Sequence, residues 1–159
     1  MESFKVSMIK LNFPDYQFRL SVKDNKTTIF DIVRKKFVRL TDEEWVRQHC
    51  ISYLINEKQC PASLIAVEKE LSLNTMKKRT DIVVYYKVGT PLLIVECKAP
   101  SIKISPEVFE QAARYNLTLK VNYLMVTNGL QHYCCMIDHQ KQSFKYLEKI
   151  PSYQQLIII

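Results

Sequence analysis

Two apolar segments near the middle of the chain predict a pair of buried β-strands. Residues 82–86 (IVVYY) and 92–95 (LLIV) are continuous runs of branched and aromatic side chains, the pattern of strands that are covered on both faces. Val88-Gly89 lies between the runs and predicts a two-residue hairpin turn, with Gly89 supplying a positive φ.

The register of this hairpin predicts that two acidic side chains meet at its open end. A turn at 88–89 pairs Lys87 with Thr90 and, six steps further along each strand, Asp81 with Glu96. Opposed side chains of an antiparallel pair have Cβ atoms roughly 5 Å apart, and alternation puts Lys98 on the face of Glu96. A slip of one residue would turn Asp81 to the other face.

Charges at the ends of apolar strands need a compensating partner, because an unpaired buried carboxylate is strongly unfavourable. A divalent cation shared by Asp81 and Glu96 is one such partner, and Mg²⁺ takes oxygen ligands at about 2.0–2.1 Å. A cross-strand salt bridge at a sheet edge is the alternative that the spacing leaves open.

Two helices are predicted, one before and one after this hairpin. Thr41 caps a helix that runs to about Asn56, with Glu44 at the capping-box position, and Ser105-Pro106 begins the second. The apolar faces of the two helices contain Val46, Cys50, Tyr53 and Leu54 on the first, and Val108, Ala112, Tyr115 and Leu119 on the second.

Further strands complete a mixed pattern. They are a hairpin of 17–22 and 27–33, a strand at 64–71, a hairpin of 122–127 and 130–137 around Asn128-Gly129, and a strand near 144–147. The apolar tail at 156–159 should dock on the sheet or on a partner. Strands mixed with two substantial helices indicate an α/β domain.

The length and net charge of the chain indicate what class of protein it is. A chain of 159 residues suits one domain with a single core, and its net charge of +7 attracts polyanions, of which nucleic acid is the usual one. A merely soluble basic surface is the alternative. Lys77, Lys78 and Arg79 precede Asp81 and are placed to hold a phosphate backbone. A second basic group lies at 34–39, and either group could instead be a solvated strand edge.

The cysteines and the chain start favour a reduced, cytoplasmic protein. The five cysteines are odd in number and form no Cys-x-x-Cys pair, so neither a disulfide framework nor a zinc knuckle is indicated. No apolar leader or segment of membrane-spanning length is visible, and we expect no membrane partner.

Taken together, the motifs resemble the PD-(D/E)xK nuclease superfamily. More closely, the chain is similar over about residues 28–150 to the N-terminal nuclease domain of type I restriction enzyme R subunits. The segments that carry this resemblance are EEWVR at 43–47, VE at 67–68, RTDIV at 79–83, VECKAP at 95–100, QAARYN at 111–116 and VTNG at 126–129.

The resemblance implies a single nuclease-like domain over 1–159. Its fold would be α/β with a restriction-endonuclease-like core, a mixed central β-sheet flanked by α-helices. Residues 1–27 would be an N-terminal extension with the hairpin, and 28–150 the core. The implied activity is metal-dependent hydrolysis of DNA phosphodiester bonds, an endonuclease of a restriction-modification system that uses Mg²⁺, with Mn²⁺ as a substitute.

Residue by residue, the resemblance also implies the site. The metal ligands would be Asp81, Glu96 and the backbone carbonyl of Cys97, while Lys98 orients the attacking water and stabilises charge on the phosphate. The remaining implied residues are Gln111 and Glu44 in catalysis, and Lys77, Lys78, Arg79 and Tyr115 in nucleic-acid binding.

Some of these roles have competing interpretations. Gln111 and Tyr115 match the Gln-x-x-x-Tyr motif of RecB-like members, and their spacing puts both on one helical face, yet Tyr115 could equally pack in the core. Glu44 could be only a capping-box acid, and Glu68 an exposed strand residue or a support for the site.

The sequence departs from R subunits in one respect. It contains no Gly-x-x-x-x-Gly-Lys-Ser/Thr phosphate loop, so we expect a free-standing relative or a module serving separate restriction or motor subunits, with a homodimer left open. The alternative function is a nucleic-acid-binding or assembly module that keeps the nuclease fold and does not cut alone. A structural protein with a salt-bridged hairpin is a third possibility.

Overall fold

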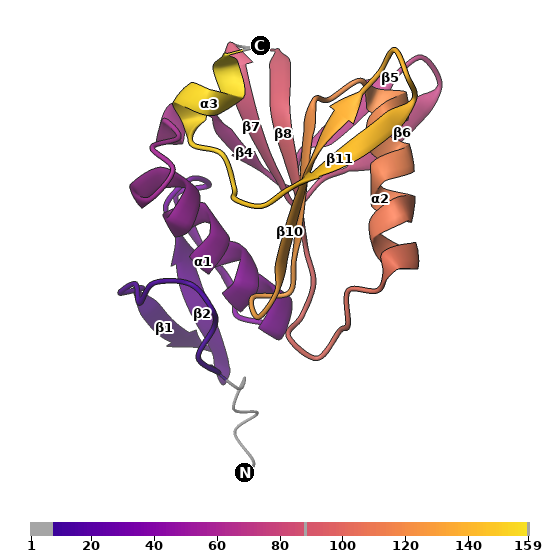
Figure 1. The fold of residues 1–159 in the computed structure, drawn as a ribbon. Coiled ribbons are helices and arrows are strands. Elements are labelled where there is room, and N and C mark those ends of the chain that lie inside the picture. Colours follow the sequence, from indigo (N-terminus) through magenta and orange to yellow (C-terminus); the bar gives the residue numbers. More distant parts are fainter. Residues whose placement is uncertain (1–7, 88, 159) are drawn as a thin grey trace.

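The computed structural model describes residues 8–87 and 89–158, and a six-stranded mixed β-sheet forms its centre (Figure 1). In spatial order the strands are β11 (Ser143–Leu147), β10 (His132–Asp138), β9 (Tyr123–Thr127), β8 (Thr90–Cys97), β7 (Ile82–Lys87) and β4 (Ile65–Val67). Only β8 and β9 are parallel neighbours, and the other pairs are antiparallel. The predicted α/β class, with a mixed central sheet flanked by helices, is confirmed.

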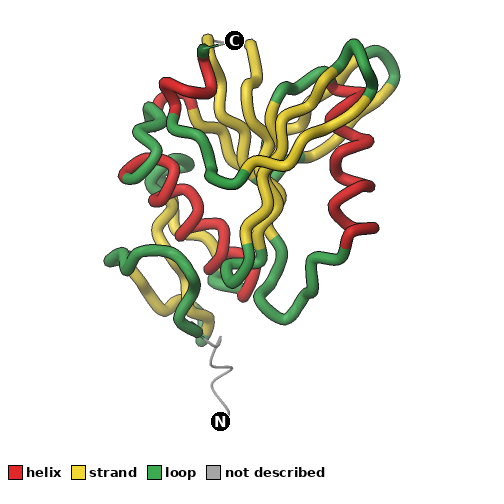
Figure 2. Tube along the Cα trace, viewed as in Figure 1, coloured by secondary structure: helices red, strands yellow, loops and turns green. Residues whose placement is uncertain are grey.

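Both faces of the sheet are covered, as Figures 1 and 2 show. Helix α1 (Asp42–Asn56) and the short α3 (Tyr153–Ile157) pack on one face. Helix α2 (Pro106–Leu119) packs on the other face. The two-stranded hairpin of β5 (Glu70–Leu73) and β6 (Met76–Arg79) lies on the α2 side.

A separate three-stranded sheet lies beside α1, and a short 3-10 helix follows that helix. The small sheet consists of β1 (Leu20–Lys23), β2 (Lys26–Asp31) and β3 (Lys36–Arg39), and the 3-10 helix η1 spans Ala62–Leu64. None of the described helices is both long and apolar enough to cross a membrane.

The doubly covered sheet explains the uninterrupted apolar runs in β7 and β8. Along β7, Ile82 and Val84 join the core on the α1 side, whereas Val83 joins the core on the α2 side. Leu93 and Ile94 divide between the same two cores on β8. The central positions of these strands, 82–84 and 92–95, are therefore buried on one side or the other.

The predicted register of the β7–β8 hairpin is confirmed where the site depends on it. Lys87 pairs with Thr90 and Ile82 with Val95, so the next opposed positions are Asp81 and Glu96. Two irregularities between Val84 and Lys87 shift the pairing and then restore it, and the sequence did not reveal them. Gly89 has the expected φ of +90°, while Val88 lies outside the described residues.

Two strand predictions need correction, and two strands were missed. The strand expected at 64–71 is divided into β4 and β5, because Glu68 adopts a φ of +53° and breaks the extended chain. The loop after β9 has four residues, 128–131, and is closed by Asn128, whose Oδ1 accepts from the backbone N–H of Leu130 and Gln131. Strands β3 and β6 were not predicted. The hairpin of β1 and β2 and the strand β11 were.

The helix predictions hold at the caps and fail in part on the buried faces. Thr41 and Ser105 each accept a hydrogen bond from a backbone N–H of the first turn. On α2, however, the buried residues are Phe109, Ala112, Ala113, Asn116 and Leu119. The predicted face is therefore rotated, and Val108 and Tyr115 border a pocket instead. In the apolar tail, Leu156 is buried in the core on the α1 side.

The two glycines provide a matched test of this fold. Both have positive φ, but a Cβ at Gly129 would lie 2.8 Å from a methyl group of Leu11, whereas one at Gly89 would meet nothing within 4 Å. We expect Gly89→Ala to lower the free energy of unfolding by about 1–2 kcal/mol through backbone strain alone. Gly129→Ala should cost about 3 kcal/mol or more, because steric overlap is added. Urea denaturation measures both, and equal losses would contradict the assigned contact.

Candidate active site

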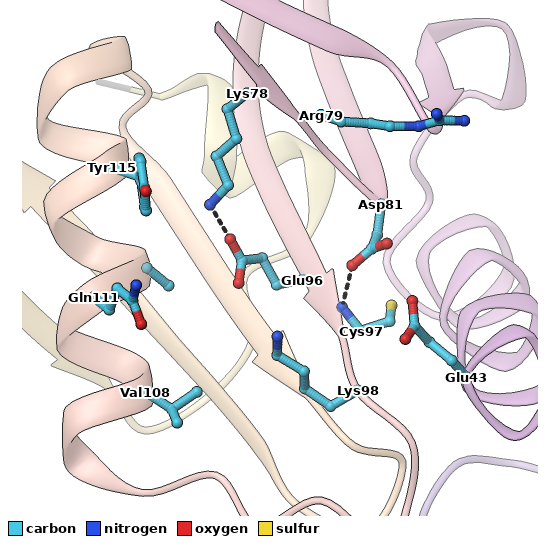
Figure 3. Close-up of a pocket in the computed structure, with 11 residues that line it drawn as sticks. Glu43, Lys78, Arg79, Asp81, Glu96, Cys97, Lys98, Val108, Gln111 and Tyr115 are labelled. Carbon is cyan, nitrogen blue, oxygen red and sulfur yellow. Dashed lines mark hydrogen bonds and ion pairs between the residues drawn. The ribbon is translucent and has the colours of Figure 1, made fainter. Parts of the chain in front are cut away.

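Eight of the ten site residues predicted from the sequence line one pocket of about 360 Å³ at the ends of β7 and β8, whereas Glu44 and Lys77 do not (Figure 3). Helix α2 forms one wall, strand β6 another, and the start of α1 contributes an acid. The lining residues are Glu43, Lys78, Arg79, Asp81, Glu96, Cys97, Lys98, Val108, Gln111, Ala112 and Tyr115. The predicted convergence of Asp81, Glu96 and Lys98 on one surface agrees with this geometry.

Asp81 is held in place from two sides. Its Oδ2 accepts a hydrogen bond of 2.7 Å from the backbone N–H of Cys97, and its Oδ1 lies 3.0 Å from Nη2 of Arg47. The residue stands immediately before β7, where the ladder of the strand has ended. The carboxylate therefore lines the pocket with both oxygens engaged.

Glu96 and Lys98 lie on the side of β8 that faces α2 (Figure 3). Glu96 is half-buried and forms an ion pair with Lys78 of β6. The Lys78 ammonium also lies 4.6 Å from the ring centroid of Tyr115, a cation–π distance. Thus the hairpin of β5 and β6 delivers a cation directly to one of the two acids.

Alternation along β6 separates the three basic residues that were grouped in the sequence. Lys78 points into the pocket, whereas Lys77 is exposed and is not among the lining residues. Arg79 reaches the rim, is largely exposed, and its Nη2 lies 3.0 Å from a carboxylate oxygen of Glu68. The structure therefore brings Lys78 and Arg79 to the pocket but not Lys77.

On helix α2, Gln111 and Tyr115 occupy the same face and both line the pocket. Their exposure to solvent shows that neither belongs to the core of the domain. Of the two interpretations of Tyr115, contact with the site therefore agrees with the structure.

The two acids at the start of α1 have different surroundings. Glu44 is buried, and its carboxylate bonds to Arg34 at 2.8 Å and to Arg47 at 2.9 Å, away from the pocket lining. Its side chain therefore does not complete a capping box. Glu43 lines the pocket instead, and burial, followed by repulsion from Asp81, raises the pKa of its carboxyl group.

Behind the pocket lies a buried network of ion pairs that the sequence did not suggest. Arg34 binds Asp31 at 2.6 Å and Glu68 at 3.1 Å, besides Glu44, and Gln48 donates a hydrogen bond to Asp31. Arg34 had been grouped with exposed basic residues at 34–39, and this is corrected. The sequence signal that could have indicated this network is the run of polar residues at 47–49, which lies between the apolar residues Val46 and Cys50 of α1.

Arg47 connects this network to the pocket. Burial opposes its charge, but Glu44 and Asp81 outweigh that effect and raise the pKa of the guanidinium above its ordinary value. The side chain therefore stays cationic although it is almost fully buried. The Arg47 guanidinium thus joins the buried network of ion pairs to Asp81 of the pocket.

The thiol of Cys97 is buried in the core on the α1 side of the sheet, away from the side that faces α2. A hydrogen bond with the Cys50 thiol and burial raise the pKa of Cys97 well above its usual range, so the thiol remains protonated. Cys97 could face a metal only through its backbone carbonyl.

The donor set suits a hard cation. The carboxylates of Asp81 and Glu96 line one pocket, and carboxylate oxygens are ligands that Mg²⁺ and Mn²⁺ prefer. Within 8–87 and 89–158, no three His, Cys, Asp or Glu side chains are arranged as a metal cluster. A cation at this pocket would therefore depend on two side chains and on backbone oxygens.

These observations define an α/β domain with a half-buried pocket of paired acids and lysines at the ends of its central strands. A family model described as the N terminus of the type I restriction enzyme R protein matches residues 42–151. The chain belongs to this family. The matched segment contains every residue that lines the pocket.

One solved structure is similar in part. It is a fragment described as an HsdR subunit of a type I restriction enzyme from Vibrio vulnificus YJ016, with 18% sequence identity and a TM-score of 0.46. The match covers 67% of this chain and 22% of that protein. No curated protein matches the chain.

The buried network should make stability depend on pH. Burial disfavours ionised Asp31, but hydrogen bonds from Arg34 and Gln48 outweigh this and lower the pKa of its carboxyl group below the ordinary 3.8. Its stabilisation is therefore complete above about pH 5 and is lost as pH falls through the lowered pKa. We expect Asp31→Asn to cost about 3 kcal/mol at pH 7, since Arg34 keeps two other carboxylates, and to cost less at pH 2.5.

Urea denaturation at both pH values measures this difference. Asp24→Asn, in the exposed turn between β1 and β2, is the control and should leave the pH dependence of wild type unchanged. An Asp31→Asn variant whose loss of stability is the same at pH 7 and pH 2.5 would contradict the assignment.

Proposed function

We propose that this domain is a metal-dependent nuclease of the PD-(D/E)xK type that hydrolyses phosphodiester bonds in DNA. The observation that carries the proposal is the meeting of Asp81, Glu96 and Lys98 in one pocket at the ends of two central strands. Membership of the family of type I restriction enzyme R protein N termini supports the same activity.

In this proposal, Asp81, Glu96 and the backbone carbonyl of Cys97 hold Mg²⁺ or Mn²⁺. The ion would supply a bound water of lowered pKa and neutralise charge on a phosphate oxygen. The hydrogen bond from the Cys97 N–H to Asp81 fixes one ligand relative to the strand that carries the other. Preorganisation of this kind reduces the cost of arranging ligands around an ion.

The remaining pocket residues act on the substrate. Lys98 orients the attacking water and stabilises the negative charge that builds on the phosphate. Gln111 and Tyr115 contact the DNA backbone from α2, and Arg79 at the rim attracts it. Glu43, rather than Glu44, is the α1 acid positioned to take part, because Glu44 is occupied by Arg34 and Arg47.

Lys78 has a double role in this mechanism. While it is paired with Glu96, the Lys78 ammonium supplies the positive charge that a metal ion would supply beside this carboxylate. A cation that binds Glu96 would displace the ammonium, which then becomes available to a phosphate in the same pocket. The proposed ligand is therefore stabilised in the absence of metal without leaving a buried carboxylate unpaired.

A second function is favoured by the same contacts. Asp81 is neutralised by Arg47 and Glu96 by Lys78, so the charges of the pocket balance without a metal ion. This suits a nucleic-acid-binding or assembly module that does not cut alone. In either case we propose that the domain acts on DNA together with other subunits of a type I restriction enzyme.

Cleavage assays test the first proposal. Plasmid and linear DNA incubated with Mg²⁺ or Mn²⁺ should be cut, and a chelator should stop the reaction. We expect Asp81→Asn and Lys98→Ala to reduce the rate by about 10²–10³-fold or more, because each removes a charge that acts on the transition state. Asparagine is chosen at 81 because its oxygen can still accept from the Cys97 N–H.

Lys145→Ala is the matched control, since Lys145 is exposed on β11 and lies outside the pocket. Circular dichroism and thermal melting establish that the variants remain folded. Near wild-type cleavage by both pocket variants would overturn the nuclease assignment, and binding of DNA by wild type that never leads to cleavage would favour the module.

Calorimetric titration of Mn²⁺ tests the metal site before any substrate is chosen. Glu96→Gln should abolish most of the binding, because an amide oxygen carries no charge. Lys78→Met should bind Mn²⁺ at least about tenfold more tightly, since a charge-assisted hydrogen bond is worth about 1.5–3 kcal/mol and no longer competes. Lys77→Met, one residue away and outside the pocket, should match wild type. Equal affinities of the Lys78 and Lys77 variants would refute the competition.

A further inference from the structure

The small sheet of β1, β2 and β3 has two faces of different chemistry. Its pairing places Leu20, Ile29 and Val38 in one row across the three strands. Ile29 and Asp31 of this face are fully buried, and Asp31 accepts a hydrogen bond from Gln48 of α1. At β2 this face therefore packs toward α1, whereas Leu20 and Val22 of β1 are exposed, and the alternate positions form an outer face directed to solvent.

The outer face is basic. Lys23 pairs with Lys26, Ser21 with Thr28 and Thr28 with Arg39, while Phe30 pairs with Phe37 and takes the carbonyl of Arg19 as its backbone acceptor. The members of the outer face are Arg19, Ser21, Lys23, Lys26, Thr28, Phe30, Phe37 and Arg39. Four of them are cations, all four are exposed, and none of the members is acidic.

One of these cations is held in a fixed position by aromatic rings. The guanidinium carbon of Arg19 lies 4.7 Å from the ring centroid of Phe30 and 5.5 Å from that of Phe37. The two rings are themselves 5.2 Å apart. A stacked guanidinium keeps the N–H donors of its edge free for an anion, and less side-chain entropy is lost when it binds one.

The dimensions of the outer face suit a nucleic-acid backbone. Arg19 and Lys23 are four residues apart, which is about 13 Å at the usual rise of a strand, and three strands span about 10 Å. One DNA strand advances about 3.4 Å per nucleotide along the helix axis, so the face can meet the phosphates of about four nucleotides.

We propose that this outer face binds the sugar–phosphate backbone of DNA at a place separate from the pocket. None of its members lines the pocket. In Figure 1, α1 lies between the small sheet and the central sheet. The contact is with phosphates, so it is independent of base sequence, and it does not require that the pocket cut DNA.

Fluorescence anisotropy with a labelled 20-base-pair duplex tests this surface. All titrations contain a chelator, so cleavage plays no part, and each affinity is measured across a series of salt concentrations. Lys23→Gln combined with Arg39→Gln removes two phosphate contacts but leaves the stack of Arg19 intact. We expect weaker binding and a loss of about 1.8 from the magnitude of the slope of log K against log salt.

Lys145→Gln combined with Lys149→Gln is the control, because it removes the same charge from exposed residues beyond the small sheet. Its salt slope should equal that of wild type. If the Lys23 and Arg39 double variant has the slope and affinity of the control, the proposal is overturned. That outcome would leave the nuclease proposal untouched, since the latter depends on cleavage and Mn²⁺ binding.

Arg19→Lys tests the aromatic support. The charge is retained, so the salt slope should stay that of wild type, while the affinity should fall because the ammonium is no longer stacked as a plane on the two rings. An affinity equal to that of wild type would overturn the assigned role of the stack.

Discussion

The arrangement of the pocket depends on the pairing of one buried guanidinium. Arg47 lies between the start of α1 and the open end of the β7–β8 hairpin, with Glu44 on one side and Asp81 on the other. A buried charge of this kind is tolerated only if carboxylates surround it. Asp81 is therefore part of the charge balance of the fold as well as a wall of the pocket, and its position is set by the packing of α1.

The second acid is balanced by a different part of the chain. Glu96 stands in a central strand, whereas its partner Lys78 comes from a two-stranded hairpin that only borders the sheet. The two carboxylates thus have partners on different elements, one on a helix that packs on the central sheet and one on a peripheral hairpin. Functional sites commonly lower the stability of the fold, because side chains whose charges and hydrogen bonds are fully paired within the protein are not free to bind a ligand.

Turns, helix caps and strand register could be predicted from the sequence, whereas ion pairs between residues far apart in the sequence could not. Turn geometry at Gly89, the caps Thr41 and Ser105 and the opposition of Asp81 and Glu96 follow from neighbours within a few residues or from strand alternation. The network of Arg34 and Arg47 joins residues up to 34 positions apart, and nothing in one sequence specifies such partners. The face of α2 was misjudged because Tyr115 is apolar enough to suit a core, yet it borders a polar pocket.

Cys97 offers a consequence of a different kind. Its backbone lies between two residues of the pocket, while its thiol is buried in the core on the α1 side and hydrogen-bonded to the Cys50 thiol. The other four cysteines are buried as well. An alkylating reagent can reach Cys97 only when β8 separates from α1. The rate of Cys97 alkylation therefore reports how often the strand that carries Glu96 opens.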